Sequence, residues 1–180
     1  MFILNTYETL QNKARKKDIE VIDYPFSSEK IKGLYCDGTI AIRKDIPTQA
    51  EKSCVLAEEL GHHYTSSGDI LNQNIVANRK QEFRARVYGY NLLIGLRGII
   101  QAHEAGCRNL YEMAEYLEVT EEYLKEALEC YRKKHGVFAT LDNYAIYFEP
   151  TLGIMKLQNK CAEMCFNKIQ KGRKRKRKWE

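Results

Sequence analysis

The sequence predicts an α+β fold, and three observations support this class. Several stretches carry apolar residues at the three-to-four-residue spacing of amphipathic helices. Other short stretches alternate apolar and polar residues, or are rich in β-branched and aromatic residues, which is typical of strands. The chain has 180 residues, of which 44% are hydrophobic, so it can bury one sizeable core.

The first 42 residues are expected to form a helix, a strand and a hairpin, in that order. Residues 6–19 have apolar side chains at helical spacing and predict an amphipathic opening helix. Residues 20–26 read as a short strand that Pro25 ends. Residues 32–42 contain two alternating runs joined by Asp37-Gly38, and an Asp-Gly pair supplies the positive φ angles of a tight hairpin turn.

A long helix is predicted to begin at Gln49, because Thr48 and Glu51 stand in capping-box register. Its small residues at positions 50, 54, 57 and 61 share one face, which we expect to pack closely on a sheet. Residues 75–96 predict a second long helix.

The rest of the chain is expected to be helical first and then extended. Residues 109–134 indicate two more helices with a turn near residues 118–120, and residues 137–150 favour strands. The predicted organisation, free of repeats and flexible linkers, has three parts: residues 1–98, the α+β domain; residues 99–150, a helical part packed on it; and residues 151–180, a C-terminal helix and basic tail.

Composition argues against membrane and secreted classes. No run of about 18 apolar residues occurs, so we expect no membrane-spanning helix. The start of the chain does not resemble a secretion signal, and the six cysteines include no CxxC pair, which favours reduced thiols and a cytoplasmic location. Cys161 and Cys165, one helical turn apart, are interpreted as a buried face rather than as metal ligands.

The net charge of +5 comes from the end of the chain. The last ten residues contain seven Lys or Arg and one Glu, a net of +6, so taking them away from +5 leaves a body at −1. Two interpretations of the tail remain: a solubilising end, or a non-specific contact with nucleic acid or acidic surfaces.

The segment Glu58-Glu59-Leu60-Gly61-His62 has the spacing of a metal-binding helix. Side chains at i and i+4 lie one turn apart, so Glu58 and His62 can hold one cation together. Glu59 stands where a carboxylate can act as general base for a metal-activated water. A catalytic zinc needs a third protein ligand, and Glu82 on the next predicted helix is the best candidate.

Two carboxylates and one histidine make a hard, anionic site. The sequence therefore favours Zn²⁺ with Mn²⁺ or Fe²⁺ as competitors. His63 is interpreted as a group that supports the ligands or faces the substrate, and Asp69 is a reserve ligand. The alternative is that this helix is an ordinary solvated acidic helix.

Two sequence blocks, "CVLAEELGHHYTSSGDI" and "NRKQEFRARVYGYNLLI", resemble the ImmA/IrrE-type metallopeptidases, especially forms carried by phages and integrative elements. The likeness extends from about Lys32 to about Pro150. It implies a zincin-like domain, in which a small sheet lies beside the active-site helix, followed by helix-turn-helix-like helices. Carried over, His62 and Glu82 become metal ligands and Glu59 the general base, while Glu58 replaces the more common histidine.

The resemblance also implies a function: cleavage of a helix-turn-helix repressor of the mobile element, which relieves repression. The alternative is a non-catalytic antirepressor that binds the repressor without cutting it. An extended substrate segment would add to a sheet edge, and the predicted strand Thr39–Ile42 is the candidate edge, with an ordinary packed hairpin as the alternative.

Specific DNA binding is not expected. Residues 109–129 resemble a helix-turn-helix, but they carry seven Glu and a single Lys125. Because phosphates repel an acidic recognition helix, these residues are predicted to be structural or to dock the repressor.

Overall fold

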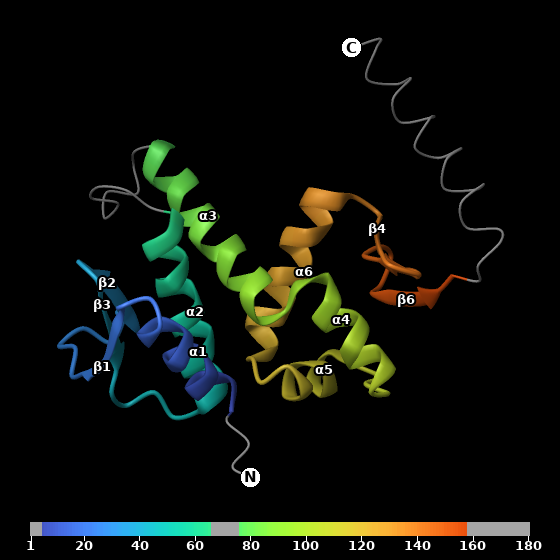
Figure 1. Cartoon of the computed structure of the whole chain (residues 1–180). Coiled ribbons are helices and arrows are strands. Elements are labelled where there is room, and N and C mark those ends of the chain that lie inside the picture. Colours follow the sequence, from blue (N-terminus) through green and yellow to red (C-terminus); the bar gives the residue numbers. More distant parts are fainter. Residues whose placement is uncertain (1–4, 66–75, 158–180) are drawn as a thin grey trace. The chain divides into compact units, whose positions relative to one another are not determined.

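The computed structural model describes residues 5–65 and 76–157, and it confirms the predicted α+β class. It divides the chain into two compact units, Met1–Cys130 and Tyr131–Glu180 (Figure 1). The predicted division of the chain into three parts, with boundaries at residues 98 and 150, stays a prediction.

A three-stranded sheet lies in the N-terminal part of unit 1. Its strands are β1 (Glu20–Tyr24), β2 (Gly33–Cys36) and β3 (Thr39–Arg43), in the order β1-β3-β2. β3 pairs parallel with β1 and antiparallel with β2, and the predicted hairpin turn is confirmed by positive φ angles at Asp37 and Gly38. The expectation that Thr39–Ile42 forms an edge is wrong, because β3 is hydrogen-bonded on both sides.

Two helices bury one face of this sheet. α1 (Thr6–Arg15) contributes Tyr7, Leu10 and Ala14 to a core that also contains the fully buried Ile40 and Ile42 of β3. α2 (Gln49–Thr65) begins where the sequence predicts, and the Glu51 amide donates to Thr48 Oγ1 at 3.1 Å. Side chains of α1, α2 and one face of the sheet therefore pack together in one core.

α2 packs closely against α3 (Val76–Leu93), as Figure 1 shows. A Cβ added at Gly61 would lie 2.2 Å from the carbonyl oxygen of Ala85, and one added at Gly89 would lie 3.2 Å from the Ala57 backbone. The small face of α2 was expected to meet a sheet, but Ala57 and Gly61 face a helix instead. Small residues on both helices allow their backbones to approach this closely.

The end of unit 1 is helical. α4 (Gly95–Glu104) follows α3 after a break at Ile94, where Gly95 has a positive φ. α5 (Leu110–Tyr116) and α6 (Glu121–His135) are joined by a turn in which Glu118 has φ of 52°, so the two predicted helices and their turn are confirmed. The Tyr90 hydroxyl donates to Glu126 Oε2 at 2.9 Å, which ties α6 to α3.

Unit 2 contains a second sheet. Its strands β4 (Phe138–Leu141), β5 (Tyr144–Tyr147) and β6 (Gly153–Lys156) form an antiparallel meander around the fully buried Ile146. The first two strands were predicted, whereas β6 was not. The C-terminal helix and basic tail were predicted for residues 151–180, and the helix prediction is wrong for residues 153–156, which form β6. Residues 158–180, which include Cys161 and Cys165, lie outside the described residues. Among the described helices, none is both long and apolar enough to cross a membrane.

Candidate metal centre

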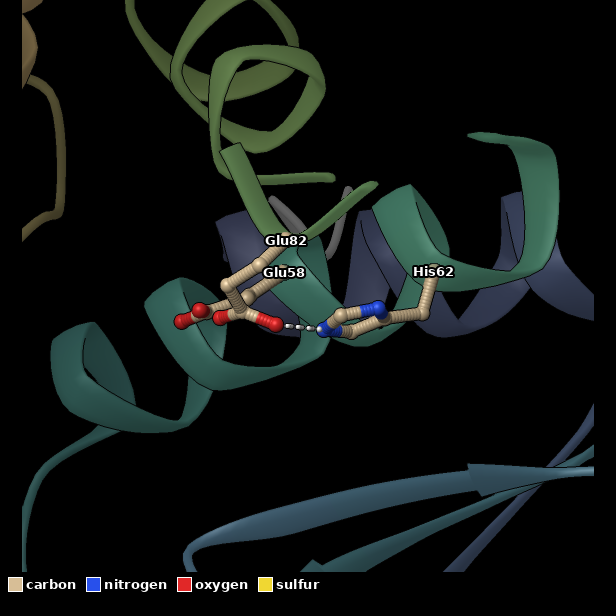
Figure 2. Close-up of side chains that lie close together, drawn as sticks. All are labelled: Glu58, His62 and Glu82. Atoms are coloured by element: carbon tan, nitrogen blue, oxygen red, sulfur yellow. Dashed lines mark ion pairs between the residues drawn. The ribbon is translucent and has the colours of Figure 1, made fainter. Parts of the chain in front are cut away.

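Three side chains on two helices converge at one point of unit 1. Glu58 and His62 project from one face of α2, and Glu82 projects toward them from α3 (Figure 2). One ligand atom from each residue lies within 4.8 Å of the other two. The structure therefore brings together the three predicted ligands, of which Glu82 lies 24 positions after Glu58 and 20 after His62 in the sequence.

One pair of donor atoms has the spacing of two ligands on a tetrahedral metal. His62 Nε2 lies 3.5 Å from Glu82 Oε2. In a tetrahedral site with bonds of 2.0–2.1 Å, ligand atoms lie roughly 3.3–3.5 Å apart. One imidazole and two carboxylates form a donor set that suits Zn²⁺ and also accepts Mn²⁺ or Fe²⁺. The residues present thus fit a bound divalent cation.

The close approach of the two helices positions the third ligand. Gly61 lies between Glu58 and His62 in sequence and faces Ala85, one helical turn from Glu82. A larger side chain at Gly61 would push α3 away, and Glu82 with it. The glycine and alanine at this contact therefore set the distance between the ligand pair and the third ligand.

Glu59 lies beside the ligands and faces the sheet. A Cβ added at Gly33 of β2 would meet Glu59 Oε1 at 2.7 Å, so the carboxyl group rests against the backbone of this strand. Burial, which has the largest effect, and the neighbouring Glu58 and Glu82 together raise the pKa of Glu59 to about 8, against a backbone hydrogen bond from Tyr35 that lowers it. A carboxyl group with a pKa near neutrality suits proton transfer in both directions.

The structure adds a residue that the sequence analysis missed. Arg86 Nε lies 3.1 Å from Glu58 Oε1 and 3.2 Å from Glu82 Oε1, so one guanidinium contacts both carboxylates. Burial raises the pKa of Glu58, and Arg86 opposes that rise. The signal in the sequence was the i, i+4 spacing of Glu82 and Arg86, but that spacing alone does not show the contact with α2.

The two remaining candidates take different places. His63 Nδ1 lies 2.9 Å from the Tyr35 hydroxyl, and the two rings meet edge to face, so His63 contacts β2. The Tyr35 hydroxyl also accepts a hydrogen bond from the Gly38 amide at 3.2 Å. His63 thus links α2 to the hairpin. Asp69 lies outside the described residues.

The chain matches a known protein family. The model of the peptidase family M78, described as the IrrE N-terminal-like domain, matches residues 14–129. The chain belongs to this family. Searches among curated proteins and among solved structures gave no match.

The residues that match the family model include α2 and α3, which carry the candidate centre, and the sheet β1–β3. It supports a metallopeptidase or an IrrE-like regulator, and it implies a metal without identifying it. The M78 domain of this chain combines that implication with three side chains that can hold an ion.

Proposed function

We propose that this M78 protein is a zinc-dependent endopeptidase in which Glu58, His62 and Glu82 hold the metal and Glu59 is the general base. The observation that carries the proposal is the convergence of three ligand atoms within 4.8 Å, with a third carboxyl group, that of Glu59, next to Glu58 on α2. When bound, the metal supplies Lewis-acid chemistry at the scissile carbonyl. Mn²⁺ or Fe²⁺ could occupy the same donors.

The residues of the chain supply proton transfer. A carboxylate oxygen of Glu59 accepts the proton of the attacking water and then returns it to the nitrogen of the leaving amine. Contact with the β2 backbone keeps this carboxyl group away from bulk water. The helix and sheet are proposed to be arranged as in a zincin, with the general base beside the metal ligands on α2.

β2 provides the edge for an extended substrate. β3 is the central strand, so within the described sheet β2 pairs on one side only, and it contacts α2 through Gly33 and Glu59. A peptide that adds to Gly33–Cys36 would make main-chain hydrogen bonds along the strand nearest to Glu59. This edge replaces Thr39–Ile42 in the proposal.

The proposed substrate is a helix-turn-helix repressor of a phage or integrative element, cut so that repressed genes are expressed. Membership in a family named for an IrrE-like regulator is consistent with such a role. The α5–α6 segment, with its seven glutamates between residues 109 and 129, is proposed to be structural or to dock the repressor, and we expect no specific DNA binding.

A second candidate function has an observation of its own. Arg86 already gives Glu58 and Glu82 a positive charge from the chain, so the two carboxylates can lie side by side without a metal. A non-catalytic antirepressor with the same fold could therefore keep these side chains in place with Arg86 alone and without a metal.

Co-expression of this chain with the repressor of the same mobile element distinguishes an endopeptidase from a non-catalytic antirepressor. We expect repressor fragments in mass spectra of cells with the unchanged chain and none with Glu59→Gln, while metal analysis finds about one ion per chain in both proteins. Glu29→Gln, an exposed carboxylate far from α2 in sequence, is the matched control and should still cut. Full relief of repression by Glu59→Gln, without metal and without fragments, would establish the antirepressor.

A further inference from the structure

Glu58 changes the charge of the proposed centre. With Glu58 and Glu82 ionised and His62 neutral, a bound dication would be neutralised completely. A second histidine in place of Glu58 would leave one positive charge, which strengthens the Lewis acid. One additional cation beside the two carboxylates would therefore restore the net charge of +1 that a site with two histidines and one carboxylate has.

Arg86 supplies that cation at the correct place. Its Nε contacts Glu58 Oε1 at 3.1 Å and Glu82 Oε1 at 3.2 Å. The Arg86 side chain is 49% exposed, compared with 31% for Glu58 and 22% for Glu82. The guanidinium thus lies on the solvent side of both carboxylates.

The two oxygens of Glu82 have different partners. Oε1 binds Arg86, while Oε2 faces His62 Nε2 at 3.5 Å. Glu82 Oε2, the oxygen that faces His62, is therefore the one that could bind a metal beside His62, whereas Oε1 is held by the Arg86 guanidinium. Glu58 likewise uses Oε1 for Arg86.

We propose that Arg86 is a positioning residue that restricts Glu58 and Glu82 to one metal-binding oxygen each and compensates the carboxylate that Glu58 introduces. This inference rests on the proposed metal centre. Three ligands with one donor atom apiece suit a four-coordinate metal with one open position, which is the preference of Zn²⁺. Carboxylates that can use both oxygens suit larger coordination numbers and oxygen-preferring ions such as Mn²⁺.

The test measures metal preference rather than peptide cleavage. The affinities of the metal-free full chain for Zn²⁺ and for Mn²⁺ are determined by competition with a chromophoric chelator. We expect Arg86→Gln to lower the ratio of Zn²⁺ to Mn²⁺ affinity about tenfold or more, because partners behind the metal ligands typically alter affinity 10–100-fold. Arg84→Gln, exposed on the same helix, is the matched control and should leave the ratio unchanged.

Two further variants separate this role from a merely structural one. Arg86→Lys keeps a cation that can donate to the carboxylates, and it should restore part of the Zn²⁺ preference. In a Glu58→His background only Glu82 remains for Arg86, so Arg86→Gln should lower the ratio less than it does in the unchanged chain.

The outcomes that oppose the proposal are distinct. If Arg86→Gln folds and its ratio of Zn²⁺ to Mn²⁺ affinity equals that of the unchanged chain, Arg86 has no role in metal preference. This holds even if both affinities change by the same factor. If the unchanged chain binds neither ion, the metal centre itself is wrong, and the role of Arg86 fails with it.

Discussion

Glu59 is a partly buried carboxyl group whose pKa is raised by its surroundings. In the metal-free protein its folded-state pKa of about 8 lies above the ordinary value of 4.5. A raised carboxyl pKa means that the folded state holds a proton that the unfolded state has lost. The stabilisation is complete below pH 4.5 and is lost as the pH rises toward 8.

We therefore predict that the free energy of unfolding of the metal-free chain falls by on the order of 3 kcal/mol between pH 5 and pH 8. Urea unfolding in the presence of a chelator measures this change. Glu59→Gln carries no titratable group at this position, so its unfolding free energy should vary much less. An equal slope in both proteins would contradict the assignment of the raised pKa to Glu59.

Cysteine reactivity offers a second prediction for single residues. Burial raises the pKa of Cys54 to about 11, despite hydrogen bonds with Thr120, whereas Cys36 is exposed on β2. Because the thiolate is the reactive form, iodoacetamide at pH 8 should label Cys36 in the folded protein and leave Cys54 unlabelled. Peptide mass mapping checks the two sites, and in urea both should react.

At the scale of elements, the contact of α2 with α3 decides whether the centre exists. Gly61→Ala places a methyl group against the Ala85 carbonyl, which lies 2.2 Å from the ideal Cβ position. We expect this change to lower the free energy of unfolding by about 1–3 kcal/mol, although alanine favours a helix more than glycine does. It should also weaken zinc binding, since Glu82 moves with α3.

Gly98→Ala is the control for this contact. Its added Cβ would meet only the flexible end of Leu117, at 3.1 Å, and it gains the same helix preference. Its unfolding free energy should change little and its zinc affinity not at all. If Gly61→Ala binds zinc as well as the unchanged chain, the glycine contact does not set the ligand distance.

At the scale of the whole molecule, a metal would join two helices that belong to one core. Binding to the folded state alone stabilises by mass action, about 2.7 kcal/mol at a free metal concentration 100-fold above Kd. We predict that Zn²⁺ raises the melting temperature, that a chelator reverses the rise, and that Glu82→Gln reduces it strongly. Glu29→Gln should respond to Zn²⁺ as the unchanged chain does.

Some features of the fold were evident from neighbouring residues alone. The Asp37-Gly38 turn, the start of α2 at Gln49 and the helical pairing of Glu58 with His62 all depend on interactions over a few positions. Local backbone preferences and helical spacing determine such features, so the sequence by itself predicted them correctly. Glu82 was also named from the residues as the best candidate for a third ligand, and the family resemblance supported that choice. Spacing along one helix does not show whether the side chains of two separate helices meet.

Only the tertiary structure decided the features that depend on partners far apart in the chain. β3 is central because it pairs in parallel with β1 on one side and antiparallel with β2 on the other. The small face of α2 meets α3 because Ala85 and Gly89 lie opposite it. Arg86 contacts a carboxylate 28 residues away as well as its own helical neighbour. Single-residue patterns carry no information about which faces meet, since packing energy belongs to the pair of surfaces and not to either one.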